Sequence, residues 1–328
     1  MTERINPFQE IYDRCNEVSP KHKFGSLGKL PTHIDVELTN KCNFRCLMCP
    51  TGVGSVKRDK GFMSDEVFFK LMEDVIPNKI PVRFIRWGEP FLHPKVFDYI
   101  KHITSNDIIV HINTNASLLD EEKLHKIIES GLSSIKFSFQ GVDKKSYREM
   151  RNIDFFDGMF SVIKRLHKIR GDAVKPYIGV STTVTYESKE MIDSFSAKIT
   201  PYVDHVNVGR TVLEHIDLDN NKLKPEAKKT LAILKEEESV VKAHFQCQEV
   251  FDKLSINWDG TVSACCTDYD DKMLIGNIID QSASKIWNNE KMNYYRSMLL
   301  EMRHEELDLC KTCYGYHGLQ TAAEVSDH

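Results

Sequence analysis

Residues 42–50 read CNFRCLMCP and place three cysteines, Cys42, Cys46 and Cys49, in one short segment. The segment follows the apolar run Ile34–Leu38, which we predict to be the first strand of a sheet. Three thiols in one loop can bind a single iron–sulfur cluster, and because such clusters normally take four cysteine ligands, one iron is left open to another ligand. Zinc is the structural alternative, although zinc sites more often combine two separated pairs of cysteines.

An alternation of strand-like and helix-like segments extends from this loop to about residue 209. Ser64 and Asp120 are typical helix caps before two of the amphipathic stretches, and Gly131 and Gly171 are typical ends. Such alternation predicts a parallel sheet with right-handed crossovers. A closed eight-stranded barrel takes about 250 residues and only about 175 are available, so we predict an α/β fold with a partial (β/α)6 TIM barrel. Its six predicted strands are Ile34–Leu38, Val82–Trp87, Ile108–Asn113, Ser134–Phe139, Tyr177–Val184 and Val203–Val208.

Further elements are predicted on both sides of the barrel. A short helix is expected near Pro7–Val18. After the barrel, alternating residues around Asp259–Gly260 predict a β-hairpin, and an apolar stripe predicts one helix over Ala283–Glu301. The predicted organisation is an N-terminal arm (1–33), the barrel (34–209), a charged helical connector (210–243), a small domain of hairpin plus helix (244–318) and a tail (319–328).

The composition limits the classes of protein that this chain can represent. It has 328 residues, 41% of them hydrophobic and 28% charged, as is typical of a globular protein. A net charge of -4 provides no overall basic field for nucleic acid. Nine cysteines are too few for a secreted disulfide scaffold, which indicates a reducing compartment. No apolar run suits a membrane span or a signal peptide, so we expect a cytoplasmic protein.

The first cysteine segment resembles the signature of the radical S-adenosylmethionine (radical SAM) enzymes, and three predicted strand ends agree with this resemblance. Gly88-Glu89-Pro90 is similar to the family's G-E-P motif, which holds the amino group of the cofactor's methionine. Residues 113–115, Asn-Thr-Asn, are similar to T-N-G, and residues 138–141, Ser-Phe-Gln-Gly, to S-x-D-G. Ala116 and Gln140 depart from the family's glycine and aspartate. The resemblance implies a [4Fe-4S] cluster on Cys42, Cys46 and Cys49, and S-adenosylmethionine contacts from Met48, Gly88, Glu89, Thr114, Ser138, Gln140 and Ser181.

A second cysteine pattern is similar to the twitch (SPASM-like) domain found in part of this family. Twelve residues separate Cys247 from Gly260, and four separate Gly260 from Cys265. With Cys310 and Cys313, the resemblance implies four ligands for one auxiliary [4Fe-4S] cluster. Zinc remains the alternative, because these cysteines also read as two pairs.

The resemblance implies reductive cleavage of S-adenosylmethionine to a 5'-deoxyadenosyl radical, which removes a hydrogen atom from a carbon of the substrate. By analogy with related enzymes of this domain plan, the expected substrate is a small hydroxylated, sugar- or cyclitol-like metabolite. Loss of an electron and a proton then dehydrogenates an alcohol, whereas gain of a hydrogen atom on the opposite face inverts the carbon. Cys266, next to the predicted ligand Cys265, is the candidate catalytic hydrogen donor, and simple packing is its alternative role. The lone Cys15 is expected to be only a small structural thiol.

Two other functions stay open on the sequence. A peptide-modifying enzyme of the same superfamily often carries a longer N-terminal recognition module than residues 1–33, and a non-enzymatic metal or cluster carrier has no need of Glu89, Thr114 and Ser138 at successive strand ends. Expected partners are the small-molecule substrate and an electron donor such as flavodoxin or ferredoxin, with neither a membrane nor nucleic acid.

Overall fold

The computed structural model describes residues 4–213, 216, 218–219, 225–236, 239–240, 247–313 and 319–320. Residues 321–328 of the predicted tail, residues 244–246 and 314–318 of the predicted small domain, and parts of the predicted connector lie outside the described residues.

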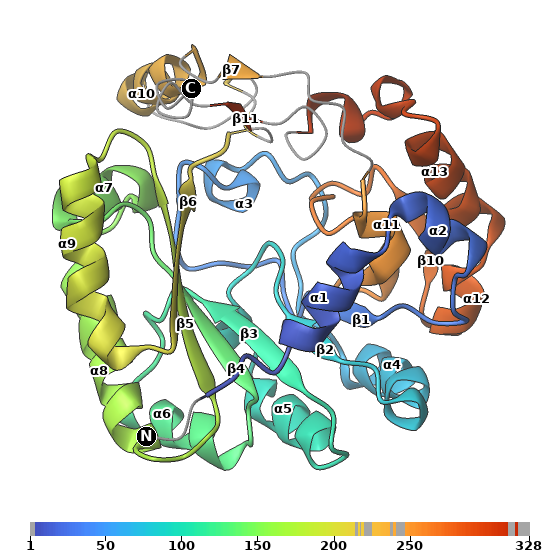
Figure 1. Cartoon of the computed structure of the whole chain (residues 1–328), viewed down its shortest axis with the longest axis horizontal. Coiled ribbons are helices and arrows are strands. Elements are labelled where there is room, and N and C mark those ends of the chain that lie inside the picture. Colours follow the sequence, from blue (N-terminus) through green and yellow to red (C-terminus); the bar gives the residue numbers. More distant parts are fainter. Residues whose placement is uncertain are drawn as a thin grey trace.

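Six parallel strands form a curved sheet that does not close, which confirms the predicted partial barrel (Figure 1). Each predicted strand is present, with ends shifted by a few residues. The strands are β1 (His33–Val36), β2 (Val82–Phe84), β3 (Val110–Thr114), β4 (Ser134–Ser138), β5 (Tyr177–Val184) and β6 (His205–Arg210).

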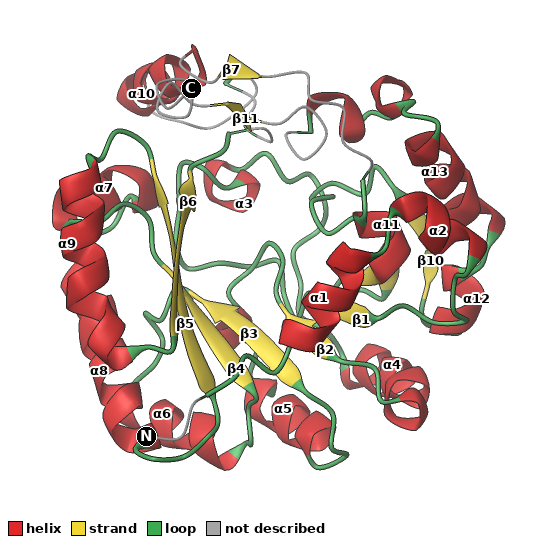
Figure 2. Ribbon diagram, in the orientation of Figure 1, coloured by secondary structure: helices red, strands yellow, loops and turns green. Residues whose placement is uncertain are grey.

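Helices cover the outer face of this sheet (Figure 2). The side chains of Ser64 and Asp120 accept hydrogen bonds from the backbone N–H of Val67 and Lys123, as expected of helix caps. Gly171 follows the last residue of α8, where the predicted helix ends. The helices between the strands are α3 (Pro50–Val53), α4 (Asp65–Asn78), α5 (Val96–Thr104), α6 (Glu121–Glu129), α7 (Lys144–Arg151), α8 (Phe156–Arg170) and α9 (Lys189–Ile199), with short 3-10 turns η1 (Pro90–Leu92) and η2 (Thr200–Tyr202).

The two faces of the strands differ in chemistry because alternate residues point to opposite sides. Residues such as Ile34, Phe84 and Phe137 are fully buried in the core under the helices. Their neighbours along the strands point to the inner side, which we call the concave face. The polar residues of the concave face include His33, Asp35, Arg83, His111, Lys136 and Lys253.

The predicted hairpin is present, and it extends the main sheet. Its strands β8 (Lys253–Ile256) and β9 (Thr261–Ser263) pair antiparallel, and β10 (Leu274–Asn277) pairs with β9. In addition β8 lies parallel to β1, so that Leu254 is opposite Ile34. The result is one nine-stranded sheet in the order β10-β9-β8-β1-β2-β3-β4-β5-β6. An unpaired edge of β1 explains this union, because exposed strand edges bind further strands.

One prediction about a helix is wrong, and one helix was not predicted. The single helix expected over Ala283–Glu301 is two helices, α12 (Ala283–Trp287) and α13 (Glu290–Leu300), because the Asn289 side chain accepts a hydrogen bond from Met292 N–H and begins a new helix. In the arm, Pro20 begins the unpredicted helix α2 (Pro20–Gly25), since proline is tolerated at the first helical position.

The predicted helix of the arm is present as α1 (Gln9–Glu17), and it lies against the concave face near β1 and β2 (Figure 1). Arg83 donates a hydrogen bond to the Tyr12 hydroxyl at 3.1 Å. No helix of the described residues is long and apolar enough to cross a membrane. The remaining elements are α10 (Pro225–Glu236), α11 (Glu249–Asp252), β7 (Ser239–Val240), β11 (Leu319–Gln320), η3 (His304–Glu306) and η4 (Cys310–Thr312).

Candidate functional site

The loop after β1 brings Cys42, Cys46 and Cys49 together. Its tight course depends on Gly52, where an added Cβ would lie 2.1 Å from the Cys46 carbonyl oxygen. Burial, together with the charges of Glu89, Cys46 and Cys49, raises the pKa of the Cys42 thiol to about 12. The three thiols lie close enough for their charges to act on one another, and iron is the kind of positive centre that would favour their thiolate forms.

Arg151, at the end of α7, supplies positive charge to this loop. Its side chain is buried, and it donates hydrogen bonds to Cys46 Sγ at 3.4 Å and to the carbonyl oxygens of Ser138 and Phe139. In the structure it joins the cysteine loop to the end of β4.

The Glu89 carboxylate is held in place on both oxygens. Oε1 accepts a hydrogen bond from the Thr114 hydroxyl and Oε2 one from Asn115 N–H, each at 2.8 Å. Burial raises the pKa of Glu89 to about 7, against the lowering effect of these hydrogen bonds. The Thr114 hydroxyl also accepts a hydrogen bond from Ala116 N–H. This second bond fixes the hydroxyl, which in turn orients the Glu89 carboxylate. Ala116 takes a φ of 64°, which explains why glycine is usual at this position in the family.

Gly88 permits the approach of this strand end to the cysteine loop. A Cβ at Gly88 would lie 1.9 Å from the Thr39 carbonyl oxygen, so a larger residue would force the two loops apart. Asn115 completes the junction, because its side chain lies 3.9 Å from Cys42 Sγ and donates to Asn43 Oδ1 at 2.9 Å.

A cavity of about 260 Å³ adjoins this junction at the ends of β4, β5 and β6. Four predicted cofactor contacts line it: Met48, Ser138, Gln140 and Ser181. The Gln140 side chain, however, is bound within the protein, since its amide nitrogen donates to the Thr183 carbonyl oxygen at 3.0 Å and to the Thr211 hydroxyl. The residue that replaces the family's aspartate therefore ties the chain after β6 to β5.

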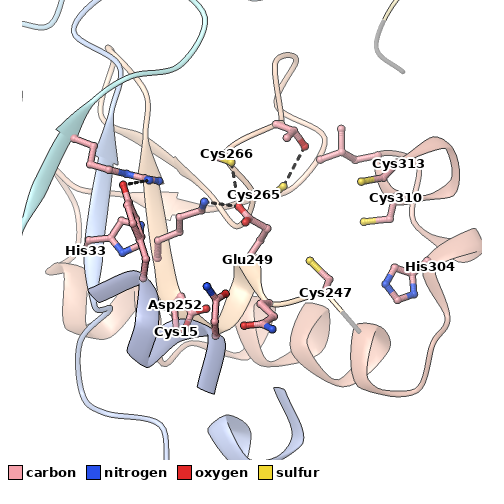
Figure 3. Close-up of a pocket in the computed structure, with 17 residues that line it drawn as sticks. Cys15, His33, Cys247, Glu249, Asp252, Cys265, Cys266, His304, Cys310 and Cys313 are labelled. Carbon is pink, nitrogen blue, oxygen red and sulfur yellow. Dashed lines mark hydrogen bonds and ion pairs between the residues drawn. The ribbon is translucent and has the colours of Figure 1, made fainter. Parts of the chain in front are cut away.

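A second and larger cavity of about 650 Å³ holds the four remaining predicted ligands (Figure 3). Cys265 follows β9, Cys310 lies in η4, and Cys247 and Cys313 lie in flanking loops; the four thiols surround a common space. Burial raises the pKa of Cys310 to about 12, with a further contribution from Cys313. In the described residues, no group of three or more His, Cys, Asp or Glu side chains is arranged as a single-ion site. The cavity and its four thiols fit a cluster ligated by cysteine alone.

Cys266 lines the same cavity, and its thiol is hydrogen-bonded to that of the adjacent Cys265 (Figure 3). Its thiol donates a hydrogen bond to Glu249 Oε2 at 3.0 Å, and the same oxygen is 2.5 Å from Lys253 Nζ. Cys15 also lines the cavity, and its thiol lies 3.7 Å from the Thr32 hydroxyl. Arg83 and Lys253 of the concave face line the cavity as well, so it reaches the interior of the barrel.

The structure places two further charged side chains near the site, Arg86 and Lys136. Arg86, with a φ of 111°, turns its side chain to the loop after β9 and donates to the Asp268 carbonyl oxygen at 2.7 Å. Lys136 points to the concave face between the buried Ile135 and Phe137, and it lines the smaller cavity. A lysine between two core residues of a predicted strand was the signal available for Lys136.

Comparisons with known proteins agree with this geometry. Residues 36–195 match the radical SAM superfamily, and residues 247–314 match an iron–sulfur cluster-binding domain of the SPASM type. The S-adenosyl-L-methionine-dependent 2-deoxy-scyllo-inosamine dehydrogenase of Niallia circulans is 27% identical over 296 residues, which cover 88% of this chain and 94% of that protein.

Solved structures share the fold. BtrN in complex with AdoMet and 2-DOIA matches with a TM-score of 0.56 and 22% identity, covering 87% of this chain and 93% of that one. Streptococcus suis SuiB bound to S-adenosylmethionine matches with a TM-score of 0.65 and 15% identity, covering 90% of this chain and 75% of that one.

Proposed function

The chain belongs to the radical SAM superfamily and carries an iron–sulfur cluster-binding domain after its barrel, and on this basis we propose that it dehydrogenates an alcohol carbon of a small cyclitol- or sugar-like metabolite. In this proposal Cys42, Cys46 and Cys49 hold the first [4Fe-4S] cluster, and the auxiliary [4Fe-4S] cluster takes the four thiols of the larger cavity. When bound, the first cluster and S-adenosylmethionine supply the radical that removes hydrogen from carbon, and the auxiliary cluster accepts an electron.

The residues of the chain bind and orient the reactants. Glu89 receives the ammonium group of the cofactor's methionine, with its oxygens fixed by Thr114 and Asn115. Arg151 balances the negative charge of the cysteine loop. Burial of Glu89 and Cys46 excludes water from this region, which protects a carbon radical from side reactions.

One observation supports dehydrogenation most strongly: the cavity that contains the four cysteines is also lined by Arg83 and Lys253 of the concave face. A substrate on the concave face would therefore lie beside the auxiliary cluster. Four cysteine ligands leave no iron for substrate, so electron transfer is the role that remains for this cluster. The similarity to the Niallia circulans dehydrogenase extends over both parts of the chain.

Epimerisation is the second candidate, and the placement of Cys266 favours it. Its thiol lies in the same cavity and is hydrogen-bonded to Glu249 as well as to the neighbouring Cys265 thiol. A thiol S–H that reaches the substrate radical could return a hydrogen atom to its opposite face. Modification of a peptide is the third candidate; the PqqA peptide cyclase of Bradyrhizobium diazoefficiens is 28% identical over 115 residues, or 35% of this chain.

The test is anaerobic turnover in D2O. The reconstituted protein is incubated with S-adenosylmethionine, reduced flavodoxin or ferredoxin, and 2-deoxy-scyllo-inosamine or another amino- or deoxycyclitol, with Cys46→Ala as the inactive control. Dehydrogenation removes about two mass units from the cyclitol, whereas inversion by a thiol adds about one unit of solvent deuterium. Cleavage of S-adenosylmethionine while every cyclitol stays unchanged would count against both outcomes and favour a peptide substrate.

A further inference from the structure

Lys136 occupies an unusual position for a lysine. It lies in the middle of β4, opposite Asn113 of β3 and Gly179 of β5. Gly179 leaves space beside it, because even an added Cβ there would be 3.9 Å from Lys136 Cγ. Across the part of the chain that the structure describes, its ammonium group has no hydrogen-bond or ion-pair partner. A half-buried amine without a partner, in the interior of an enzyme, is a candidate for function.

Lys136 lines the smaller cavity and is within electrostatic reach of Arg83, which lines the larger one. It lines the smaller cavity together with Ser138, two residues further along the same strand and the same face. The charges of Arg83 on β2 and Asp35 on β1 act on its amine, and Arg83 lines the larger cavity. A substrate that reaches from the strand ends towards the auxiliary site would lie over the part of the concave face that carries Lys136 and Arg83.

The surroundings of Lys136 disfavour the charged form of its amine. Burial lowers the pKa of Lys136, the charge of Arg83 lowers it further, and Asp35 acts in the opposite direction. Asp35 offers limited compensation because both of its oxygens are bound to Arg83, at 2.6 and 2.8 Å. The other titratable groups near this amine are His111 on β3, whose own pKa Lys136 lowers, and Arg151 and Arg210, which line the same cavity.

We propose that Lys136 is the general base that accepts the hydroxyl proton of the substrate during alcohol dehydrogenation. This inference rests on the proposed function. After hydrogen-atom removal, the substrate carbon carries one unpaired electron and a hydroxyl group. The O–H bond breaks, its proton passes to the lone pair of the neutral Lys136 Nζ, and the C–O bond becomes C=O. The one electron released passes to the oxidised auxiliary iron–sulfur cluster. The proton on Nζ then returns to solvent.

The test compares two variants with the reconstituted wild type. Lys136→Gln removes the base, and Lys136→Arg keeps the positive charge but stays protonated. Lys126→Gln, on the exposed face of α6, is the control for loss of one lysine charge. We expect ketone formation from the cyclitol to fall at least about 100-fold in both Lys136 variants, whereas 5'-deoxyadenosine formation stays within about threefold of wild type. The rise of ketone formation with pH in the wild type should be lost in both.

A second measurement does not depend on turnover. Acetylation of each lysine, followed by mass spectrometry at increasing pH, reports the pH at which its amine becomes neutral and reactive. We expect Lys136 to react at a lower pH than Lys126. Equal titration of the two lysines would overturn the proposal. Ketone formation by Lys136→Arg at the wild-type rate would also overturn it, because only the positive charge of Lys136 would then matter.

The outcomes separate this inference from the proposed function. Absence of ketone from the wild type, with cleavage of S-adenosylmethionine intact, rejects dehydrogenation itself and the role of Lys136 with it. Ketone formation in the wild type that persists in Lys136→Gln rejects only the base. A weaker binding of S-adenosylmethionine in Lys136→Gln, with an unchanged ratio of ketone to 5'-deoxyadenosine, also rejects the base and assigns Lys136 to the cofactor.

Discussion

The guanidinium of Arg86 donates a hydrogen bond to the carbonyl oxygen of Asp268 at 2.7 Å. This contact joins the end of β2, one residue before the Trp87-Gly88-Glu89 segment, to the loop that carries Cys265. The Arg86 side chain is fully buried, and its Nε lies 3.9 Å from Glu37, which is itself paired with Arg58. The cofactor end of the barrel and the auxiliary cavity are thus fixed to each other by side chains of the sheet.

Removal of Arg86 should weaken this junction. Arg86→Ala loses the buried hydrogen bond of a charged group, with an expected cost of about 2 kcal/mol in the free energy of unfolding. Arg86→Gly loses the same bond but accepts the φ of 111° without strain, so it should be less destabilised than Arg86→Ala. Urea denaturation of both variants under anaerobic conditions measures the difference; equal stability of Ala and Gly would contradict strain at this residue.

Glu89→Gln should weaken binding of S-adenosylmethionine by at least about tenfold, because the carboxylate that faces the ammonium group is lost. In the wild type, binding should strengthen as pH rises from 6 to 8, since burial raises the pKa of Glu89 to about 7 and only its ionised form attracts the ammonium. The same raised pKa means that Glu89 stabilises the fold at low pH and that this contribution is lost as pH rises through about 7. Calorimetric titration at several pH values measures the binding, with the exposed Glu66→Gln as control. Equal affinity at pH 6 and pH 8 would exclude this role of Glu89.

Asp35→Asn should destabilise the concave face. Asp35 is fully buried, is bound by Arg83 through two hydrogen bonds, and lies 3.8 Å from Lys253 Nζ. Loss of its charge leaves the buried guanidinium of Arg83 without its carboxylate partner, with an expected cost of about 3–5 kcal/mol, whereas Lys253 keeps its ion pair with Glu249. Burial raises the pKa of Asp35, but Arg83 and Lys253 outweigh it and hold the pKa below its usual value. Wild-type stability should therefore fall in acid, as pH drops through that lowered pKa, and the variant should lose this dependence. Urea titrations between pH 3 and pH 7 test both expectations, and identical curves would refute them.

Iron content should distinguish the two cysteine sets. The reconstituted wild type is expected to bind about eight iron atoms, and Cys247→Ala and Cys42→Ala about four each, because each variant loses a ligand of a different cluster. Cys15→Ala is the matched control and should keep the wild-type content. Iron and sulfide analysis with EPR spectroscopy gives the result; zinc in place of iron after anaerobic purification would contradict the assignment of the second set.

Cys266→Ala separates the two outcomes of the reaction. If the thiol supplies a hydrogen atom, the variant should still form 5'-deoxyadenosine but should no longer incorporate solvent deuterium into the substrate carbon. If the enzyme is a dehydrogenase, ketone formation should change by less than about tenfold, since Cys266 then only packs against Glu249. Product analysis by mass spectrometry, with Cys15→Ala as a second thiol variant, decides between them.

The strands of the barrel could be predicted from local patterns, because each is a short apolar run between segments of helical periodicity. The parallel pairing of β8 with β1 had no such signal, since it joins segments from opposite ends of the chain. The break at Asn289 was missed because the apolar stripe continues through both helices.

The candidate site also has features that the sequence predicts and features that only the structure shows. Cysteine spacing indicated two sets of thiols, and the structure brings each set together. Whether Thr114 touches a ligand or orients Glu89 depends on hydrogen bonds that no spacing reveals. Gln140 likewise read as a contact of the site, although its amide is bound to Thr183 and Thr211.

The union of β8 with β1 has a consequence for synthesis of the chain. While the ribosome has made only the barrel, one edge of β1 presents unpaired N–H and C=O groups, which favour aggregation. The edge becomes covered only after residues 253–256 emerge, so the barrel completes its folding late and together with the segment that follows it. A fragment that ends before Cys247 should accordingly be prone to aggregate, because the edge of β1 would stay uncovered.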